Sequence, residues 1–253
     1  MLNGREPSDV LDVLEHFPAL TPARRRGVEI LDDPDVDPAV RRQSIRDVTR
    51  SNRLLGGLRA ASLEVRHALR EVGGNGNFSL LDVGTGLADV PLRAARDAAR
   101  DGVALTTIGV DQAASLLVVA RDCLTHAVCA DALALPFRDR SVDIVMCSQV
   151  LHHFEIGDAE RLVRELNRVA RRAVIVCDLR RSWLAAFGFW AVSFPMRFHR
   201  VTRHDGVVSV FRGFTTAELN RIVKAATGST PIVRRRLGYR VTARWAPEPG
   251  RVA

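Results

Sequence analysis

The sequence predicts an α/β protein built on a doubly wound, mostly parallel sheet. From residue 78 onwards, short apolar runs alternate with amphipathic stretches. The apolar runs are residues 79–83, 105–110, 127–130, 142–147 and 173–177, and the amphipathic stretches are residues 90–100, 113–123 and 159–170. Fully apolar strands that alternate with helices are typical of a parallel sheet covered on both faces. The handedness of β-α-β crossovers then makes the sheet doubly wound.

Two helical regions accompany this sheet. Residues 1–77 are highly charged and helix-like in spacing, and we predict an N-terminal helical cap there, with the main domain over residues 78–253. Gly56-Gly57 interrupts the helical spacing of the cap and marks either a hinge or a helix end. An aromatic-rich helical insertion is expected over residues 180–213, after the fifth strand.

The C-terminal part carries a clear helix signal. Thr215 and Glu218 have capping-box spacing, which predicts a helix that begins there and ends near Gly228. From Pro231 the residues alternate enough to predict closing strands.

The composition sets limits on the possible functions. With 253 residues, 47% of them hydrophobic and 26% charged, the chain can bury one sizeable core. The net charge of +8 comes almost entirely from scattered arginines without an RNA-binding signature, so we expect a solvated surface and no nucleic-acid partner. The first residues lack a secretory signal, and the apolar run 183–198 is shorter than the roughly 20 residues that span a bilayer. We expect a cytoplasmic protein without stable membrane insertion.

No metal site is expected. Cys123, His126 and Cys129 have a spacing that superficially resembles metal ligands. A structural zinc site usually needs four ligands in a recognised pattern, and no fourth ligand lies nearby in the sequence.

The strongest local signal is the glycine-rich turn after the first predicted strand. Gly84 and Gly86 follow Asp82, and glycines let the chain turn tightly and let a ligand approach the backbone. Asp111 ends the second strand, where an acidic residue can accept the hydroxyls of a ribose, and Asp131 follows the third. Together these acids predict an adenosine pocket at the carboxyl edge of the sheet. Such a pocket suits NAD and S-adenosylmethionine equally.

The successive motifs resemble those of class I S-adenosylmethionine-dependent methyltransferases. The similarity covers about residues 78–180, and the ubiquinone/menaquinone methyltransferases are the closest broad group. The motifs are Asp82-x-Gly84-x-Gly86, Gly109-Val110-Asp111, residues 130–137, and residues 142–145 followed by Leu151-His152-His153. The flanks, such as residues 32–35, 52–55, 178–182 and 203–215, are similar to bacterial methyltransferases often encoded beside polyketide-type biosynthetic enzymes.

This resemblance implies a Rossmann-like sheet of seven strands, S-adenosylmethionine as the cofactor, and methyl transfer as the reaction. It places Asp82, Gly84 and Gly86 at the methionine end of the cofactor, Asp111 at the ribose, Asp131 and Ala132 at the adenine, and Ser148 beside the sulfonium, with Thr85 and Gln112 also in the cofactor site. Arg53, in the helical cap, is a candidate for the cofactor carboxylate. Ala88 departs from the pattern, since many relatives have a third glycine there.

Three histidines are candidates for the catalytic base. Histidine is the commonest group that removes the proton of an oxygen acceptor. His152 and His153 follow the fourth strand, and His204 lies in the insertion. A structural role for the His152-His153 pair is an open alternative. His204 is either a base held by Asp205 or part of a local turn bonded to it.

The insertion is predicted to cover the acceptor. Trp183, Trp190, His204 and Arg212 are the expected substrate-binding residues, in a lid for an apolar or aromatic molecule. Core packing is one alternative for the aromatic residues. A membrane-surface helix is another, although the run lacks an obvious basic face at helical spacing.

We therefore expect a methyltransferase of secondary metabolism, a monomer or homodimer, acting on a small phenolic, quinone-like or polyketide-derived acceptor. Oxygen is favoured over carbon as the methylated atom. One alternative is an RNA or protein methyltransferase, but residues 148–151 do not resemble the Asn-Pro-Pro-Tyr tetrapeptide of amino-group methylases. The other is a non-catalytic S-adenosylmethionine-binding protein.

Overall fold

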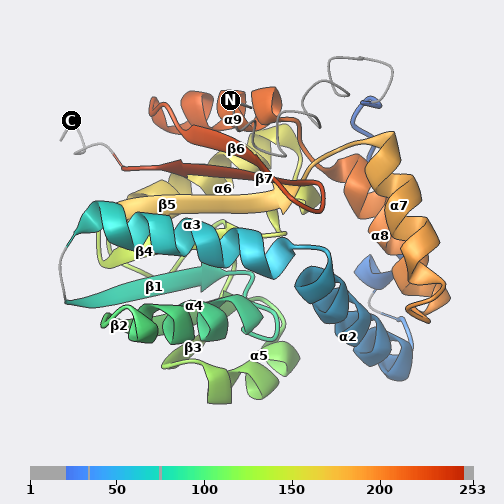
Figure 1. Cartoon of the computed structure of the whole chain (residues 1–253), viewed down its shortest axis with the longest axis horizontal. Helices are drawn as coiled ribbons and strands as arrows, with labels where there is room; N and C mark the ends of the chain where they lie inside the picture. Colours follow the sequence, from blue (N-terminus) through green and yellow to red (C-terminus); the bar gives the residue numbers. More distant parts are fainter. Residues whose placement is uncertain (1–20, 34, 74–75, 248–253) are drawn as a thin grey trace, which may run out of the picture.

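A computed structural model describes residues 21–33, 35–73 and 76–247, and its centre is a seven-stranded sheet in the order β3-β2-β1-β4-β5-β7-β6 (Figure 1). Strands β1 to β5 run parallel, β7 is antiparallel to β5, and β6 is antiparallel to β7. The strands are β1 (Asn77–Val83), β2 (Ala104–Asp111), β3 (His126–Cys129), β4 (Val142–Ser148), β5 (Ala170–Leu179), β6 (Ile232–Arg236) and β7 (Arg240–Trp245). The predicted α/β fold with a mostly parallel, seven-stranded, Rossmann-like sheet is confirmed.

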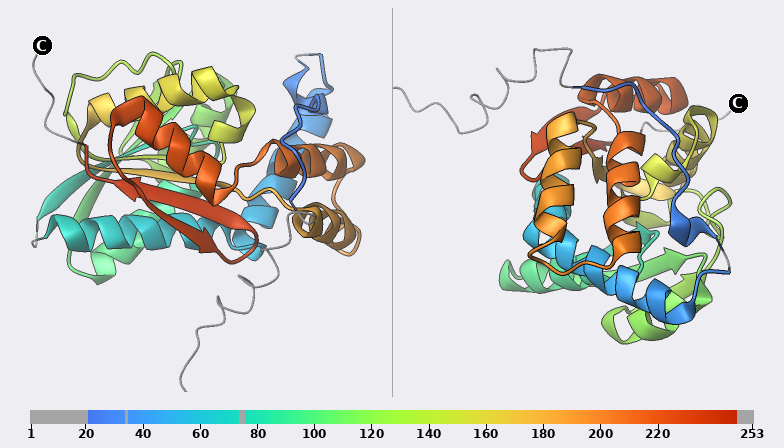
Figure 2. Two further views of the ribbon diagram at one scale, coloured as in Figure 1. Left: turned by 90° about the horizontal axis from the view of Figure 1, so that it is seen from above. Right: turned by 90° about the vertical axis from the view of Figure 1, so that its right-hand side faces the viewer.

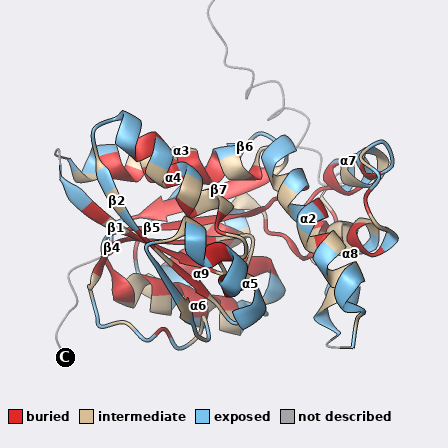
Figure 3. Cartoon of the chain, turned by 90° about the horizontal axis from the view of Figure 1, so that it is seen from below, coloured by how far each residue is buried: buried red, intermediate tan, exposed pale blue. Residues whose placement is uncertain are grey.

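Helices cover both faces of the sheet (Figure 2). Helices α3 (Gly57–Val72) and α4 (Asp89–Arg100) contribute alanines and valines to the core on one face. Helices α6 (Ile156–Val169) and α9 (Thr216–Thr227) contribute leucines and valines to the core on the other face. Helix α5 (Ala114–Ala120) packs against β2 and β3. The middle strands are therefore buried from both sides, as their unbroken apolar runs predict (Figure 3).

The expected boundaries are found at two positions. Helix α2 (Pro38–Leu54) ends before the glycine pair, and α3 begins at Gly57, so Gly56-Gly57 is a helix end. Thr215 caps α9 through the reciprocal bonds of a capping box with Glu218, and the helix ends at Gly228, which has a φ of 75°.

The insertion after β5 is a pair of helices, α7 (Trp183–Ser193) and α8 (Arg200–Arg212), which lie side by side beyond the end of the sheet (Figure 2). His204 and Asp205 lie within α8, so the local bond between their side chains forms on a helix and not in a turn. Gly206 also lies inside α8 and does not end the helix. A Cβ at this position would lie 2.1 Å from the ring of Phe189, so the missing side chain lets α7 approach α8. Within the described ranges, every helix is too short or too polar to cross a bilayer.

Glu64 joins α3 to the last two strands. Its side chain is 3% exposed and accepts hydrogen bonds from Thr242 at 2.7 Å, from Arg244 at 3.3 Å and from Arg236. Burial alone raises the pKa of Glu64, but the bonds from Thr242 and Arg236 outweigh it and lower the pKa below its ordinary value. The carboxylate is therefore charged at neutral pH and holds the β6–β7 hairpin on α3.

The turn of this hairpin presses against the α2–α3 junction. A Cβ on Gly238, whose φ is 73°, would lie 1.7 Å from the carbonyl oxygen of Leu55. A Cβ on Gly56 would likewise lie 2.9 Å from the carbonyl oxygen of Leu237. Glycine at both positions lets the N-terminal helices dock on the C-terminal hairpin.

We expect Gly238→Ala to lower the free energy of unfolding by about 2–4 kcal/mol, because it adds a backbone clash to an unfavourable left-handed conformation. Gly102→Ala is the matched control: its φ is 74°, but nothing lies within 4 Å of the added Cβ. It should cost only about 1 kcal/mol. Urea unfolding of both variants measures the difference. Equal losses would show that the contact with Leu55 is unimportant.

Candidate cofactor and acceptor site

The glycine-rich loop follows β1 at the carboxyl edge of the sheet. Gly84 has a φ of 73°, and a Cβ there would lie 2.2 Å from the side chain of Val150, which follows β4. The amides of Gly84 and Thr85 donate to the carbonyl of Val110 at 2.8 and 2.9 Å. Gly86 has a φ of 54° and open space within 4 Å of the position of a Cβ. The loop is thus fixed by its neighbours and open at Gly86, where a ligand can approach the backbone.

Asp111 ties this loop to the end of β2. One carboxylate oxygen accepts a hydrogen bond from the amide of Gly86 and the other from the amide of Ala113, both at 2.9 Å. Each carboxylate oxygen has a second lone pair, so these bonds leave acceptor capacity for ribose hydroxyls. The sequence motifs after β1 and β2 therefore meet, as the adenosine-pocket prediction requires.

Asp82 is a buried acid with an unused acceptor. Its residue is 2% exposed, and its Oδ1 has no hydrogen-bond partner among the described residues. Burial, with a smaller contribution from the nearby charge of Asp111, raises the pKa of Asp82 to about 7. A buried carboxylate oxygen without a donor favours binding of a group that supplies one. The ammonium group of S-adenosylmethionine has this chemistry, so the residues present fit that cofactor.

The other predicted cofactor residues follow neighbouring strands. Gln112 and Asp131 are exposed after β2 and β3, and the carboxylate of Asp131 accepts a hydrogen bond from the amide of Leu133 at 2.9 Å. Ala132 and Ser148 are half-buried, and Ser148 ends β4 between β1 and β5. Because these strands are adjacent and parallel, all four residues lie on the same edge of the sheet.

Arg53 approaches the glycine-rich loop from the N-terminal helices. It lies in the last turn of α2 and forms an ion pair with Asp89, the first residue of α4. Its side chain remains 58% exposed. The predicted cation therefore lies where the loop ends, with donor capacity beyond its pair with Asp89.

His152 is held by a buried carboxylate. Its Nδ1 lies 2.7 Å from Oδ1 of Asp178, and its backbone amide donates to Oδ2 at 3.0 Å. The two side chains are 4% and 0% exposed. Burial alone raises the pKa of Asp178, but the interaction with His152 outweighs it and lowers the pKa. A charged Asp178 can accept a hydrogen bond from Nδ1 of His152, which fixes the orientation of the imidazole ring.

His153 stacks on this pair at the surface. The two imidazole centroids are 4.2 Å apart, and the side chain of His153 is 40% exposed. Its Nδ1 lies 3.4 Å from Nη1 of Arg212 and 3.8 Å from a carboxylate oxygen of Glu29. Desolvation by the surrounding protein lowers the pKa of His153, and the adjacent His152 lowers it further. His153 is therefore neutral at pH 7.

Arg212 anchors the segment that precedes α2. Its side chain is 7% exposed, and it binds Glu29 at 3.0 Å, Asp32 at 3.1 Å and the carbonyl of Gly27 at 2.6 Å. These contacts use much of its donor capacity. Arg212, which the sequence predicts to bind the acceptor, therefore lies beside His153. In this structure its hydrogen bonds go to the protein itself.

Glu29, His152 and His153 each have one atom that could bind a metal ion, and these three atoms lie within 4.8 Å of one another. The guanidinium of Arg212 lies 3.0 Å from the carboxylate of Glu29, where a cation would be repelled. The cluster is better described as a hydrogen-bonded network than as a metal centre.

The remaining predicted residues lie away from this network. His204 is 51% exposed and its Nδ1 lies 2.8 Å from Asp205, whose carboxylate also accepts from the amides of Ile30 and Leu31. Trp183 and Trp190 are 43% and 46% exposed on α7. Trp183 packs edge-on against Phe211 at 5.0 Å and Trp190 against Phe194 at 4.9 Å, and the remaining surface of both indoles faces solvent.

Sequence reasoning missed several residues of the site. Glu29 lies in no motif of the sequence. Asp178 lies in the flank 178–182 and follows a predicted strand as Asp111 does, but nothing in the sequence marks it as the partner of a histidine. Gln149 has a left-handed φ of 59°, which is uncommon for this residue type and which the sequence does not signal. Arg240 begins β7 and is 6% exposed; its Nη2 lies 3.5 Å from the side-chain oxygen of Asn52, and its Nε has no hydrogen-bond partner among the described residues.

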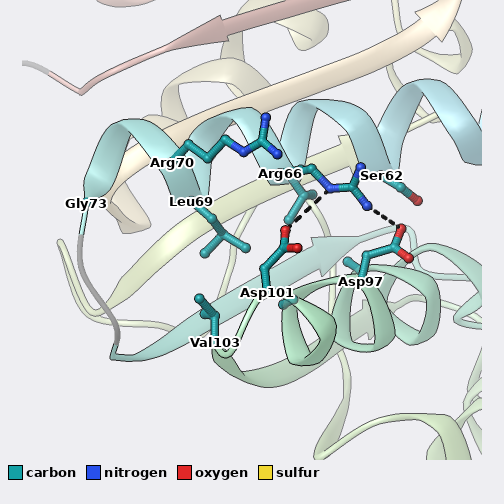
Figure 4. A pocket seen from close by; sticks show the side chains of 11 residues that line it. Ser62, Arg66, Leu69, Arg70, Gly73, Asp97, Asp101 and Val103 are labelled. Carbon is teal, nitrogen blue, oxygen red and sulfur yellow. Dashed lines mark ion pairs between the residues drawn. The ribbon is translucent and has the colours of Figure 1, made fainter.

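A separate pocket lies between α3 and α4 and contains none of the predicted site residues (Figure 4). Arg66 lies across it from Asp97 and Asp101, at 3.5 and 3.7 Å. Arg66 and Arg70, which both line the pocket, balance the charge of the two acids, and the pocket is distinct from the carboxyl edge.

Comparison with known proteins identifies the domain. Residues 81–177 match the family model described as "Methyltransferase domain". The chain contains a methyltransferase domain over these residues. The match begins within β1 and ends within β5, so this methyltransferase carries its family motifs on the five parallel strands that form the candidate site.

Solved structures share the fold of this methyltransferase at low sequence identity. Magnesium protoporphyrin IX methyltransferase from Synechocystis, solved with S-adenosylhomocysteine, has a TM-score of 0.53 and 14% identity over 85% of this chain and 90% of its own. A methyltransferase from Aquifex aeolicus has a TM-score of 0.54 and 17% identity over 84% and 100%. The plantazolicin methyltransferase BpumL, also with S-adenosylhomocysteine, has a TM-score of 0.58 and 14% identity over 79% and 74%. The two neighbours solved with S-adenosylhomocysteine share the fold of this chain and support S-adenosylmethionine as its cofactor.

The raised pKa of Asp82 predicts a specific pH dependence of stability. Between its ordinary pKa of 3.8 and its folded value of about 7, the folded state holds a proton that the unfolded state has lost. Without cofactor, this group therefore makes the free energy of unfolding fall as the pH rises through that window. We expect Asp82→Asn to remove the effect. The free energy of unfolding of Asp82→Asn minus that of the wild type should increase from about pH 4 to about pH 7 and then stay constant. A constant difference would contradict the raised pKa.

Proposed function

We propose that this methyltransferase transfers the methyl group of S-adenosylmethionine to an oxygen of a small apolar or aromatic acceptor, of phenolic, quinone-like or polyketide-derived chemistry. The observation that carries the proposal is the His152–Asp178 pair with His153 stacked on it, directly after β4 at the edge that carries the glycine-rich loop. An oxygen nucleophile must lose a proton, and a neutral imidazole at this place supplies the acceptor for it. An RNA or protein acceptor, the alternative, has only the net charge of +8 in its favour.

Each cofactor-binding residue has a proposed role. The sulfonium of the cofactor supplies an activated methyl group when bound. Asp82 accepts a hydrogen bond from the ammonium, the backbone of Gly84 to Gly86 borders the methionine moiety, and Asp111 accepts the ribose hydroxyls. Asp131 and Ala132 border the adenine, and Ser148 lies beside the sulfonium. The task of the chain is then to hold donor and acceptor in line and to exclude water.

Two arginines are candidates for the cofactor carboxylate. Arg53 lies at the loop, beside Asp89. Arg240 is buried, and its Nε and the side-chain nitrogen of Gln149 lie 3.2 and 3.3 Å from the position that a Cβ on Gly57 would occupy. Burial lowers the pKa of Arg240 to about 10, so the group stays positively charged at neutral pH. Its unsatisfied Nε suits an anionic group that approaches along the end of α2.

We propose His153 as the catalytic base and the His152–Asp178 pair as the group that positions it. His153 is the more exposed of the two imidazoles, and its lowered pKa keeps it unprotonated. Asp178 fixes the ring of His152, and His152 supports His153 through the stacked contact. His204, on α8, is the second candidate base, oriented by Asp205.

Asp111→Ala should weaken S-adenosylmethionine binding by about 1–3 kcal/mol, because charge-assisted hydrogen bonds to the ribose are lost. Isothermal titration calorimetry measures the affinity. Asp122→Ala is the matched control, since Asp122 lies in the short 3-10 helix after α5, its side chain is 86% exposed, and it pairs with Arg121 at 3.7 Å. An unchanged affinity in Asp111→Ala would remove the ribose assignment.

His153→Ala should abolish most of the turnover with an oxygen acceptor, while His126→Ala, an exposed histidine on β3, should not. A tritium-transfer screen of phenols and quinones supplies the acceptor. For the wild type, the acidic limb of kcat/KM should have its midpoint below about 6.5, because the pKa of the base is lowered. A midpoint at or above this value, or an unchanged profile in His153→Ala, would exclude His153. In that case His204→Ala decides whether the second candidate is the base.

A further inference from the structure

The outer surface of α7 is apolar and exposed. The helix contains no charged residue, and its 11 residues are too few to cross a bilayer. Six large apolar side chains of α7 and the residue after it are at least 36% exposed: Trp183 (43%), Leu184 (43%), Phe187 (65%), Trp190 (46%), Val192 (36%) and Phe194 (48%). Figure 2 shows α7 at the end of the molecule beyond the sheet. We call these six side chains the α7 surface. Helical spacing places Trp183, Phe187, Trp190 and Phe194 on one side of α7, and the ring of Trp190 lies 6.0 Å from that of Phe187 and 4.9 Å from that of Phe194. An exposed apolar surface of this kind marks an interaction site.

Arginines border the α7 surface. The guanidinium of Arg203 lies 3.7 Å from the ring centroid of Phe194, and that of Arg25 lies 5.7 Å from Trp183. Arg197, in the connection to α8, and Arg200, the first residue of α8, are exposed. Residues 179–204 contain no acidic residue. The sequence pattern of α7 alone shows no basic face, but the fold supplies one from α8 and from the segment before α2.

This combination fits one kind of partner better than a second copy of the chain. A symmetric dimer places the same patch on both subunits. Pairing through the α7 surface would bring one set of arginines against the other, without acids from residues 179–204 to offset them. An anionic lipid surface instead accepts tryptophans and phenylalanines at the headgroup level and attracts arginines to its phosphates.

We propose that the α7 surface docks on an anionic phospholipid membrane, with α7 lying in the plane of the interface. The aromatic side chains enter the headgroup region, and Arg25, Arg197 and Arg200 contact lipid phosphates. The protein remains peripheral, because the helix does not span the bilayer. This inference goes beyond the proposed methyl transfer and does not depend on the identity of the acceptor. Since α7 follows β5 at the carboxyl edge, docking would also bring that edge near molecules dissolved in the bilayer.

Vesicle flotation of the full chain tests the proposal without any activity measurement. The wild type should bind vesicles of phosphatidylcholine with phosphatidylglycerol, bind pure phosphatidylcholine much more weakly, and dissociate as salt rises. Trp183 and Trp190 are exposed whereas Trp245 is 5% exposed, so tryptophan emission should shift to the blue on binding. The variants Phe187→Ser with Trp190→Ser, and separately Arg197→Glu with Arg200→Glu, should each lose about tenfold or more in affinity for the anionic vesicles.

Val118→Ser with Val119→Ser is the matched control, because both valines are 62% exposed on α5, away from α7. This control should bind as the wild type does. Circular dichroism and urea unfolding confirm that each variant is folded, and the charge reversal keeps the proposal testable if the aromatic variant is not.

Three results would overturn the proposal. The first is a wild type that does not bind anionic vesicles. The second is an equal loss of binding in the α5 control. The third is a wild-type dimer, seen by light scattering, that Phe187→Ser with Trp190→Ser converts to a monomer while vesicle binding persists.

Discussion

The carboxylate of Asp111 determines how the edge of the sheet is organised. It accepts the amide of Gly86 from the loop after β1 and the amide of Ala113 from the loop after β2. Parallel strands bring their carboxyl ends to one edge, but the loops beyond them need a common partner to stay in register with one another. One acid at the end of β2 therefore orders both the glycine-rich loop and the start of α5. The position of Asp82 beneath that loop follows from the same arrangement.

A second network fixes the other half of the edge. Arg24 donates to the carbonyl oxygens of His152 and Phe154 at 3.2 and 2.9 Å, and Arg212 binds Glu29 at 3.0 Å. The segment before α2 and helix α8 are thus both attached to the loop that follows β4. His153 lies among these contacts, so its environment depends on elements that come from three distant parts of the sequence. The same contacts set its pKa, through desolvation and through the adjacent imidazole.

Much of the fold could be predicted from the sequence because its signals are local. Apolar runs gave the five parallel strands, and the spacing of Thr215 and Glu218 gave the start of α9. Helix α8 is different. Asp205 and Arg212 are buried on it against the N-terminal segment, so polar and apolar residues do not separate into two faces and the helical period is hidden. Gly206 also weakens the helical signal of the sequence. Glycine is needed there because the ring of Phe189, 17 positions earlier, packs against it, and this contact cannot be read from the local sequence.

In the candidate site, too, the residues that lie in local motifs could be predicted from the sequence and the others could not. The glycine-rich loop and Asp111 carry motifs, whereas Glu29 and Arg240 reach the edge only through tertiary packing. No local pattern records that a residue on β7 lies beside the end of α2. Sequence spacing likewise places Trp183 and Trp190 in an insertion over the site, but their exposure depends on how α7 packs on α8.

The bonds of Glu64 have a consequence for biosynthesis. This carboxylate is on an early helix, and its partners Arg236, Thr242 and Arg244 lie near the end of the chain. During translation, α3 emerges long before the hairpin that neutralises its buried acid. Until the ribosome has released the last strand, an isolated carboxylate on α3 opposes closure of this face of the sheet. This face of the sheet therefore closes only after residues 236–244 have been synthesised.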